Sequence, residues 1–108
     1  APIAKLSGRA LYDSYCASCH KTDGKGIKGT FPALENSAAV NGDVKTLAQI
    51  ISNGLKDQTI GGIKYDAQMP AFSFLKDEEA TAIINHIRTN FKNQAPTITV
   101  NQYKQTKN

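Results

Sequence analysis

Hydrophobic side chains recur at three- and four-residue intervals in three separate stretches of this chain, and that spacing is the period of an α-helix. The stretches cover about residues 7–20, 43–53 and 77–91. Asp43 is a suitable N-cap for the second stretch, and Gly54 ends it. The three apolar stripes consist of Gly8, Leu11, Tyr12, Tyr15, Cys16 and Cys19; of Val44, Leu47, Ile50 and Ile51; and of Ala80, Ile83, Ile84, Ile87 and Phe91. The pattern therefore predicts three main helices.

The segments between these helices are predicted to be long loops. Residues 21–28 are rich in glycine, but they lack the spacing of a phosphate-binding loop. The apolar stretch 31–34 contains a proline, which prevents a helix from continuing through it. Residues 55–75 contain the pair Gly61-Gly62, which indicates a turn. The predicted fold class is therefore all-α, with three main helices and long loops.

The first predicted helix ends on Cys16-Ala17-Ser18-Cys19-His20, a C-x-x-C-H pattern. Cysteines three residues apart on a helical turn point the same way, so both sulfurs can add to the two vinyl groups at one edge of a porphyrin. The histidine that follows then lies beneath the ring, where its imidazole can bind the iron. The pattern predicts one covalently attached haem c, with Cys16 and Cys19 as attachment sites and His20 as an axial ligand.

Three other interpretations of the cysteine pair explain the sequence less well. A redox dithiol is typical of a βαβ context, which the helical pattern does not offer. A structural zinc site needs a second pair of ligands, yet Cys16 and Cys19 are the only cysteines and His86 stands alone. A disulfide between the two cysteines leaves His20 without a role. Haem attachment gives all three side chains a function.

The ligand on the opposite face of the haem is less directly indicated. Met69 is the only methionine, and it lies in a predicted loop directly before a proline. Its thioether could close over the second face, although a lone methionine is usually a flexible core residue. His86 lies beside the apolar stripe of the third helix, where a hydrogen-bonded or solvated boundary histidine is the simpler interpretation. A lysine ligand remains an alternative if Met69 is displaced.

The composition fits one small domain that depends on its cofactor. Of the 108 residues, 40% are hydrophobic and none is tryptophan, so a buried porphyrin would supply a large share of the core. The protein without haem is therefore expected to fold poorly. We assign residues 1–95 to the domain and 96–108 to a polar C-terminal tail or linker. Within the tail, Thr97-Ile98-Thr99-Val100 has strand-like alternation but no obvious partner strand.

Targeting signals are not evident in the sequence. No run of residues is long and apolar enough to span a bilayer. The N-terminus has no positively charged leader followed by an apolar stretch, so we interpret Ala1 as a processed end or as a boundary within a longer chain. Because c-type haem is attached outside the cytoplasm, we expect a periplasmic location or another extracytoplasmic compartment.

Four features occur together between residues 6 and 93. They are C-A-S-C-H at 16–20, Phe31-Pro32-Ala33-Leu34, Tyr65-x-x-x-Met69-Pro70-Ala71-Phe72 before the last helix, and the pair Gly8 and Tyr12. In this combination the chain resembles the class I c-type cytochromes of bacterial type. The resemblance implies a small cytochrome c fold, Met69 as the distal ligand, and a Pro32 carbonyl that accepts a hydrogen bond from His20. It also implies that the first helix crosses the last one closely at Gly8 and Tyr12.

Two helix ends depart from the family pattern. Lys76 stands where the family usually has a capping Ser or Thr, so we expect Asp77 to cap the last helix. Phe91-Lys92-Asn93 replaces the common W-G-N ending of that helix. Both changes concern helix ends more than the iron, so the resemblance holds at the predicted site.

The function that this resemblance implies is one-electron transfer, without a substrate site of the protein's own. His/Met ligation would fill both axial positions of the iron and favour its ferrous state. The chain would act as a soluble carrier or as the electron-entry module of a larger oxidoreductase. Its tail loosely resembles extensions in cytochrome modules that work with copper nitrite reductases or quinoprotein dehydrogenases. The alternative is a haem enzyme or gas sensor with a labile Met69, and carbon monoxide binding distinguishes the two.

Charge indicates the class of partner. The formal net charge is +4 and the pI is about 9.1, which produces a moderate positive field. Lys21, Lys25 and Lys28 follow the C-x-x-C-H pattern, either as a solvated loop or as a transient docking patch for an acidic redox protein. Basic runs interleaved with aromatic residues are absent, so nucleic-acid binding is not indicated. We expect a monomer.

Overall fold

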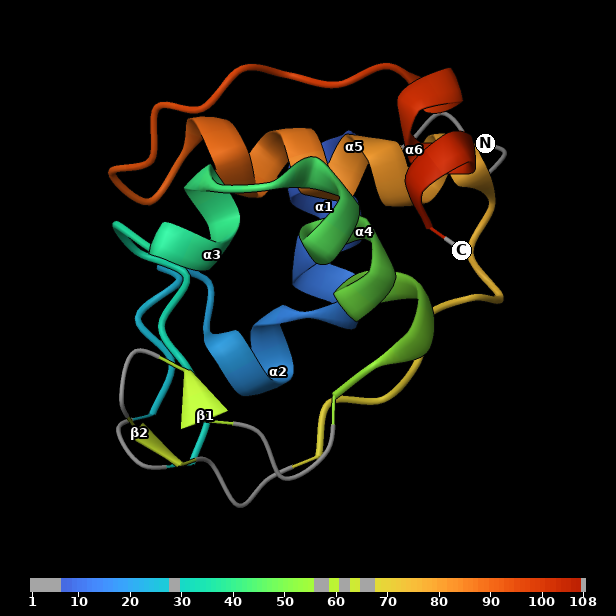
Figure 1. Cartoon of the computed structure of the whole chain (residues 1–108). Helices are drawn as coiled ribbons and strands as arrows, with labels where there is room; N and C mark the ends of the chain where they lie inside the picture. The colour runs from blue at the N-terminus through green and yellow to red at the C-terminus, as the bar shows by residue number, and fades with distance from the viewer. Residues whose placement is uncertain (1–6, 28–29, 56–58, 61–62, 65–67, 108) are drawn as a thin grey trace.

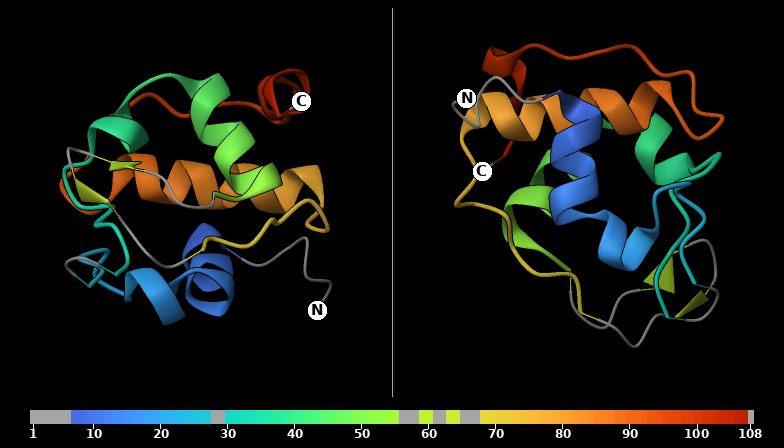
Figure 2. Two further views of the ribbon diagram at one scale, coloured as in Figure 1. Left: turned by 60° about the horizontal axis from the view of Figure 1, so that its bottom comes forward. Right: turned by 180° about the vertical axis from the view of Figure 1, so that it is seen from behind.

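The computed structural model describes residues 7–27, 30–55, 59–60, 63–64 and 68–107. Its elements in chain order are α1 (Gly8–Tyr15), α2 (Ala17–His20), α3 (Ala38–Asn41), α4 (Val44–Asn53), β1 (Thr59–Ile60), β2 (Ile63–Lys64), α5 (Asp77–Thr89) and α6 (Val100–Thr106). Figure 1 shows α5 across the top of the molecule, and Figure 2 (right) shows α1 crossing it on the opposite side from α4. The two strands form a short antiparallel hairpin in which Ile60 pairs with Ile63. The all-α prediction is confirmed.

The predicted first helix consists of two helices that meet at Cys16. The Ser7 hydroxyl caps α1 by accepting a hydrogen bond from the Ala10 N–H at 3.1 Å. The Cys16 N–H still donates to the Tyr12 carbonyl at 2.8 Å, and its own carbonyl accepts from the His20 N–H at 2.9 Å. Because helical hydrogen bonds continue on both sides of the joint, the C-x-x-C-H pattern remains on a single turn.

The first and last predicted helices cross with their backbones almost in contact. A side chain at Gly8 would collide with the Ala82 carbonyl of α5. Tyr12 is fully buried at the same crossing, where its ring centroid lies 5.4 Å from that of His86 and 5.2 Å from that of Phe91. The close crossing predicted for Gly8 and Tyr12 is confirmed.

The second predicted helix has the expected bounds. Asp43 caps α4 by accepting a hydrogen bond from the Lys45 N–H at 3.2 Å, and Gly54 follows the last helical residue. The turn predicted at Gly61-Gly62 lies outside the described residues. The periodicity did not predict α3, which is only four residues long and is capped by Ser37.

The last predicted helix begins with a cap other than the expected one. Lys76, not Asp77, is the N-cap of α5, and Asp77 is its first helical residue. The Lys76 N–H donates to the Glu79 carboxylate at 2.8 Å, which is the half of a capping box that needs no hydroxyl at the N-cap. The helix ends at Thr89, two residues before the predicted end, and Phe91 has a positive φ of 55°.

The segment predicted as a polar tail forms α6 and packs against α4 and α5. The strand-like pattern at 97–100 is misleading, because Thr99 is the N-cap of α6. Thr99 accepts from the Gln102 N–H at 3.1 Å, and the Gln102 side chain accepts from the Thr99 N–H at 2.7 Å. Ile98 and Tyr103 are 6% and 2% exposed. The residues after Pro96 therefore contribute to the core.

Asn93 connects the end of α5 to the segment that contains Pro32. Its amide nitrogen donates to the carbonyls of Leu34 and Ile87, both at 2.8 Å. Its amide oxygen accepts from the Ser37 N–H at 3.0 Å and from the Asn41 side chain at 2.8 Å. The side chain is buried, with 3% of the residue exposed. Four hydrogen bonds thus hold the segment from Leu34 to α3 against α5.

Arg88 makes a second buried connection from α5. Its Nε donates to the Pro96 carbonyl at 2.9 Å, and its Nη1 donates to the Val40 and Gly42 carbonyls at 2.9 and 3.1 Å. The residue is 3% exposed. This guanidinium therefore satisfies backbone carbonyls on both the α3–α4 turn and the start of the C-terminal segment.

Candidate haem-binding site

The two cysteines lie at the joint between α1 and α2. Both are partly buried free thiols and are not joined by a disulfide bond. Burial, with a smaller effect of Cys19, raises the pKa of the Cys16 thiol to about 12. A reactive redox dithiol has a lowered pKa, so this environment does not fit one. The i, i+3 spacing on one helical turn fits the addition of both thiols to the vinyl groups of a single porphyrin.

His20 is held in the tautomer that a metal ligand requires. It is the last residue of α2 and is 8% exposed, and its Nδ1 lies 2.8 Å from the Pro32 carbonyl oxygen. A carbonyl oxygen only accepts, so Nδ1 carries the proton and Nε2 keeps its lone pair. Burial lowers the pKa of His20, and the hydrogen bond to Pro32 opposes that shift. The predicted contact between His20 and Pro32 is confirmed.

The glycine-rich loop brings Pro32 to His20. The Gly26 N–H donates to the His20 carbonyl at 3.0 Å, and Ile27 and Phe31 form an isolated antiparallel bridge. Gly26 has φ +63°, and a Cβ there would lie 2.7 Å from the Pro32 carbonyl oxygen and would also collide with the Phe31 carbonyl. The loop therefore requires glycine for both conformation and space. The sequence analysis did not identify Gly26 as the residue that lets the Pro32 carbonyl approach His20. The only signal for it was a glycine placed six residues after His20.

We expect Gly26→Ala to destabilise the holoprotein by about 1–3 kcal/mol, because a side chain is strained at this φ and displaces the Pro32 carbonyl. Urea unfolding of the ferric protein measures the change. Lys25→Ala, at the exposed neighbouring position, is the control and should have little effect. Equal stability of the two variants would contradict this account of the loop.

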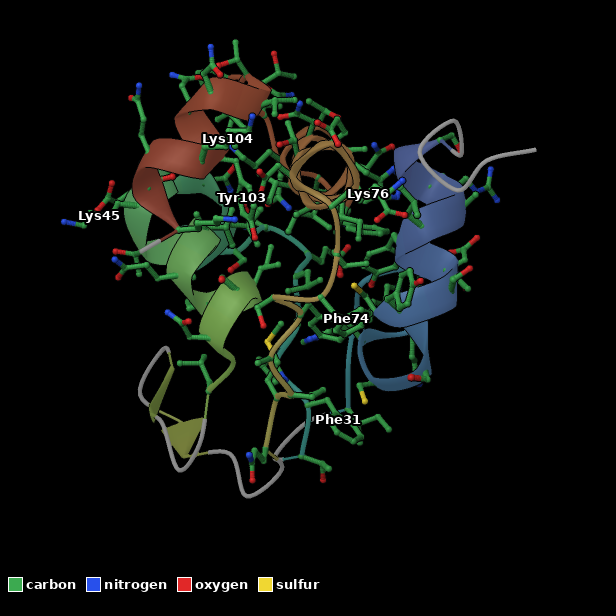
Figure 3. The ribbon with its side chains drawn as sticks, turned by 90° about the vertical axis from the view of Figure 1, so that its right-hand side faces the viewer. Phe31, Lys45, Phe74, Lys76, Tyr103 and Lys104 are labelled. Carbon is green, nitrogen blue, oxygen red and sulfur yellow. The ribbon has the colours of Figure 1, made fainter. Side chains whose placement is uncertain are left out.

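Met69 lies on a segment that is paired with the end of α4. The Met69 N–H donates to the Leu55 carbonyl at 2.8 Å, and the Leu55 N–H donates to the Met69 carbonyl at 3.0 Å. Three residues later, the Phe72 N–H donates to the Ile51 carbonyl at 2.9 Å. The Met69 side chain is partly buried against the core. In Figure 2 (left) and Figure 3, the segment 68–76 passes between α4 and the α1–α2 pair.

Aromatic contacts link the Met69 segment to the haem-attachment helices. The ring centroid of Tyr15, directly before Cys16, lies 6.2 Å from that of Phe72 and 5.8 Å from that of Phe74. Phe74 is 67% exposed and projects beside α1 in Figure 3. Sequence reasoning missed this cluster. It shows that the segments containing Cys16 and Met69 lie close together.

His86 is used in packing at the crossing of α1 and α5. Its ring centroid lies 5.4 Å from those of both Tyr12 and Phe91, and its Nδ1 is 3.3 Å from the Asn90 side-chain nitrogen. Burial lowers the pKa of His86. The prediction of a hydrogen-bonded boundary histidine is therefore confirmed.

A comparison with protein families agrees with this arrangement, because the family model described as cytochrome c matches residues 6–91. The chain belongs to the cytochrome c family. A cytochrome c-552 of Thermus thermophilus is 38% identical over 92 residues, which cover 81% of this chain and 62% of that protein. The fructose dehydrogenase cytochrome subunit of Gluconobacter japonicus is 32% identical over 91% of this chain and 21% of the subunit. The chain therefore spans less than two thirds of the Thermus protein and about a fifth of the dehydrogenase subunit.

The residues of this cytochrome c fit its covalent cofactor. Cys16 and Cys19 are free and lie one helical turn apart, and His20 presents an unprotonated nitrogen. The cytochrome binds one haem c through this pattern and functions in electron transfer.

The lysines expected near the haem edge lie directly after the attachment turn. Lys21 and Lys25 are exposed, whereas Lys28 lies outside the described residues. The Tyr12 hydroxyl donates to the Lys21 carbonyl at 2.7 Å, and the Asp23 carboxylate accepts from the Lys25 N–H at 3.0 Å. The backbone of both lysines is therefore anchored while their side chains face solvent.

Proposed function

We propose that this cytochrome carries one electron at a time through a haem whose axial ligands are His20 and Met69. The observation that carries the proposal is the pairing of Met69 with Leu55, since it fixes the only methionine on the segment that contacts the attachment helices. His86 is partly buried and its ring packs against those of Tyr12 and Phe91, which supports Met69 as the distal ligand.

The chain's own residues support electron transfer with little rearrangement. When bound, the haem supplies a one-electron couple at its iron. The Pro32 carbonyl orients His20 and increases its donor strength, while a soft thioether from Met69 favours the reduced state. Because both ligand segments are held by backbone hydrogen bonds, little of the polypeptide has to move when the charge of the site changes.

Carbon monoxide binding tests whether both axial positions of the iron are filled by protein ligands. Two protein ligands leave no open position, so the reduced protein should bind carbon monoxide poorly. Optical spectroscopy monitors the binding. Rapid and complete binding of carbon monoxide would instead identify a haem enzyme or gas sensor with a labile Met69.

The whole protein is proposed to be a free carrier or the electron-entry module of a larger oxidoreductase. The names of two relatives, the cytochrome subunits of a fructose dehydrogenase and of a quinone-type alcohol dehydrogenase from Gluconobacter oxydans, support the second form. Covalent haem attachment supports an extracytoplasmic location such as the periplasm. Within the described residues, no helix is both long and apolar enough to cross a membrane.

A transient partner with an acidic surface is proposed to dock near Lys21, Lys25 and Lys28. Lys21 and Lys25 are exposed directly after the attachment turn, and the net charge of +4 favours approach of an acidic protein. Such contacts are small, so the cytochrome would act as a monomer that binds and releases its partner quickly.

We expect Lys25→Glu to slow electron transfer to an acidic partner by roughly threefold to tenfold at low ionic strength, with the difference shrinking as salt is added. Stopped-flow kinetics over a salt series measures it. Lys45→Glu and Lys104→Glu make the same charge change on α4 and α6, away from α2 in Figure 3, and should have smaller effects. Equal slowing by all three variants, or no salt dependence, would rule out a localised docking patch.

A further inference from the structure

The end of α4 holds the Met69 segment in place through backbone contacts. The three backbone hydrogen bonds described above join the segment to Ile51, in the last turn of α4, and to Leu55, two residues after the helix ends. Gly54 has φ +77°, and a Cβ there would collide with the Met69 carbonyl and lie 2.9 Å from the Pro70 carbonyl carbon. Because the two backbones are in contact, a shift of this turn must move Met69.

The helix α6 holds this same turn of α4 from the other side. Tyr103 is 2% exposed and Ser52 is 5% exposed, and the Ser52 side chain lies close enough to the Tyr103 phenol to oppose the larger effect of burial, which raises the phenol's pKa. Ser52 directly follows Ile51, whose carbonyl accepts from Phe72. Figure 3 shows Tyr103 pointing from α6 into the space between α4 and α5.

A second contact from α6 reaches the other end of the Met69 segment. Lys107 Nζ lies 2.8 Å from the Asp77 carboxylate, at the first residue of α5 and directly after the segment 68–76. The two side chains are 29% and 21% exposed. The same ammonium lies 5.7 Å from the ring centroid of Tyr103. Tyr103 therefore connects α6 to the turn of α4 that pairs with the Met69 segment, and Lys107 connects it to the residue directly after that segment.

We propose that α6 is a brace for the distal ligand, in which Tyr103 and Lys107 act as positioning residues that slow the departure of Met69 from the iron. This inference rests on the proposed axial role of Met69. Neither residue lies on the Met69 segment or on the attachment turn. Each limits the movement of the chain that presents the thioether, Tyr103 through α4 and Lys107 through the start of α5.

The test is the rate at which imidazole replaces Met69 in the ferric holoprotein, followed by the loss of the far-red absorption band of Met–Fe(III). Where departure of Met69 limits the exchange, Tyr103→Phe should accelerate it roughly threefold to tenfold, the size expected for losing one polar contact in the interior. Lys107→Met should accelerate it about twofold to threefold, as expected for a partly exposed ion pair. Lys107→Met also provides the test if Tyr103→Phe fails to fold.

Two controls separate bracing from general stability. Ser37→Ala removes the cap of α3, away from α6, and Lys104→Met removes an exposed charge from α6 itself. The proposal expects neither control to accelerate exchange, even where Ser37→Ala lowers the urea midpoint as much as Tyr103→Phe does. Unchanged exchange in both brace variants, or equal acceleration in the controls, would overturn the brace while leaving Met69 as the ligand. A wild-type ferric protein without the far-red band would overturn the ligand assignment, and the brace with it.

Discussion

Replacing Met69 by alanine is expected to convert a haem that binds carbon monoxide poorly into one that binds it readily. The substitution removes the only thioether in the chain and leaves the distal position to water or to an added ligand. The far-red absorption band of the ferric protein should disappear. The reduction potential should fall by roughly 0.1 V or more, within the ~0.8 V range over which axial ligands act. Spectroelectrochemistry and carbon monoxide titration measure these changes.

The matched control is Met69→His. An imidazole can fill the same position, so carbon monoxide binding should stay poor while the potential falls, because a nitrogen ligand favours the ferrous state less than sulfur does. If Met69→Ala left the potential, the far-red band and carbon monoxide binding unchanged, Met69 would not be the distal ligand, and His86 or a lysine would have to be considered.

Replacing Asn93 by leucine is expected to reduce the free energy of unfolding by about 3–5 kcal/mol. Leucine has a similar size but cannot make the four hydrogen bonds to Leu34, Ile87, Ser37 and Asn41. Buried polar groups that lose their partners cost about 1–3 kcal/mol each, and the cost falls when the chain relaxes around them. Urea unfolding of the ferrous holoprotein gives the value from the midpoint at constant slope.

Asn101→Leu is the control for this substitution. Asn101 is exposed on α6, so the same exchange should change the stability by less than about 0.5 kcal/mol. A loss below about 1 kcal/mol for Asn93→Leu would contradict the view that Asn93 holds the segment from Leu34 to α3 against α5.

Most of the helical structure was predictable because its signals are local. The helix α4 has a clear apolar stripe, an acidic N-cap and a terminal glycine, and all three lie within twelve residues. The attachment pattern was equally local, since a single turn from Cys16 to His20 places its three functional side chains. The contact of His20 with Pro32 came from the family resemblance, and the structure confirms it.

The features that the sequence did not reveal depend on contacts between distant residues. Asn93 binds Leu34 and Ser37, which precede it by 59 and 56 residues, and no spacing rule predicts such partners. The helix α6 was missed because its seven residues are polar apart from Val100 and Tyr103, and its stability comes from packing on α4 and α5. The sequence identified Met69 as a candidate distal ligand, but its pairing with Leu55 is visible only in the structure.

The most direct test of the central claim is the far-red absorption spectrum of the ferric protein, recorded for the wild type and for Met69→Ala under the same conditions. The account predicts a Met–Fe(III) charge-transfer band in the wild type that disappears on reduction and is absent from the variant. A correctly folded wild-type protein that lacks the band in the ferric state would contradict His20/Met69 ligation.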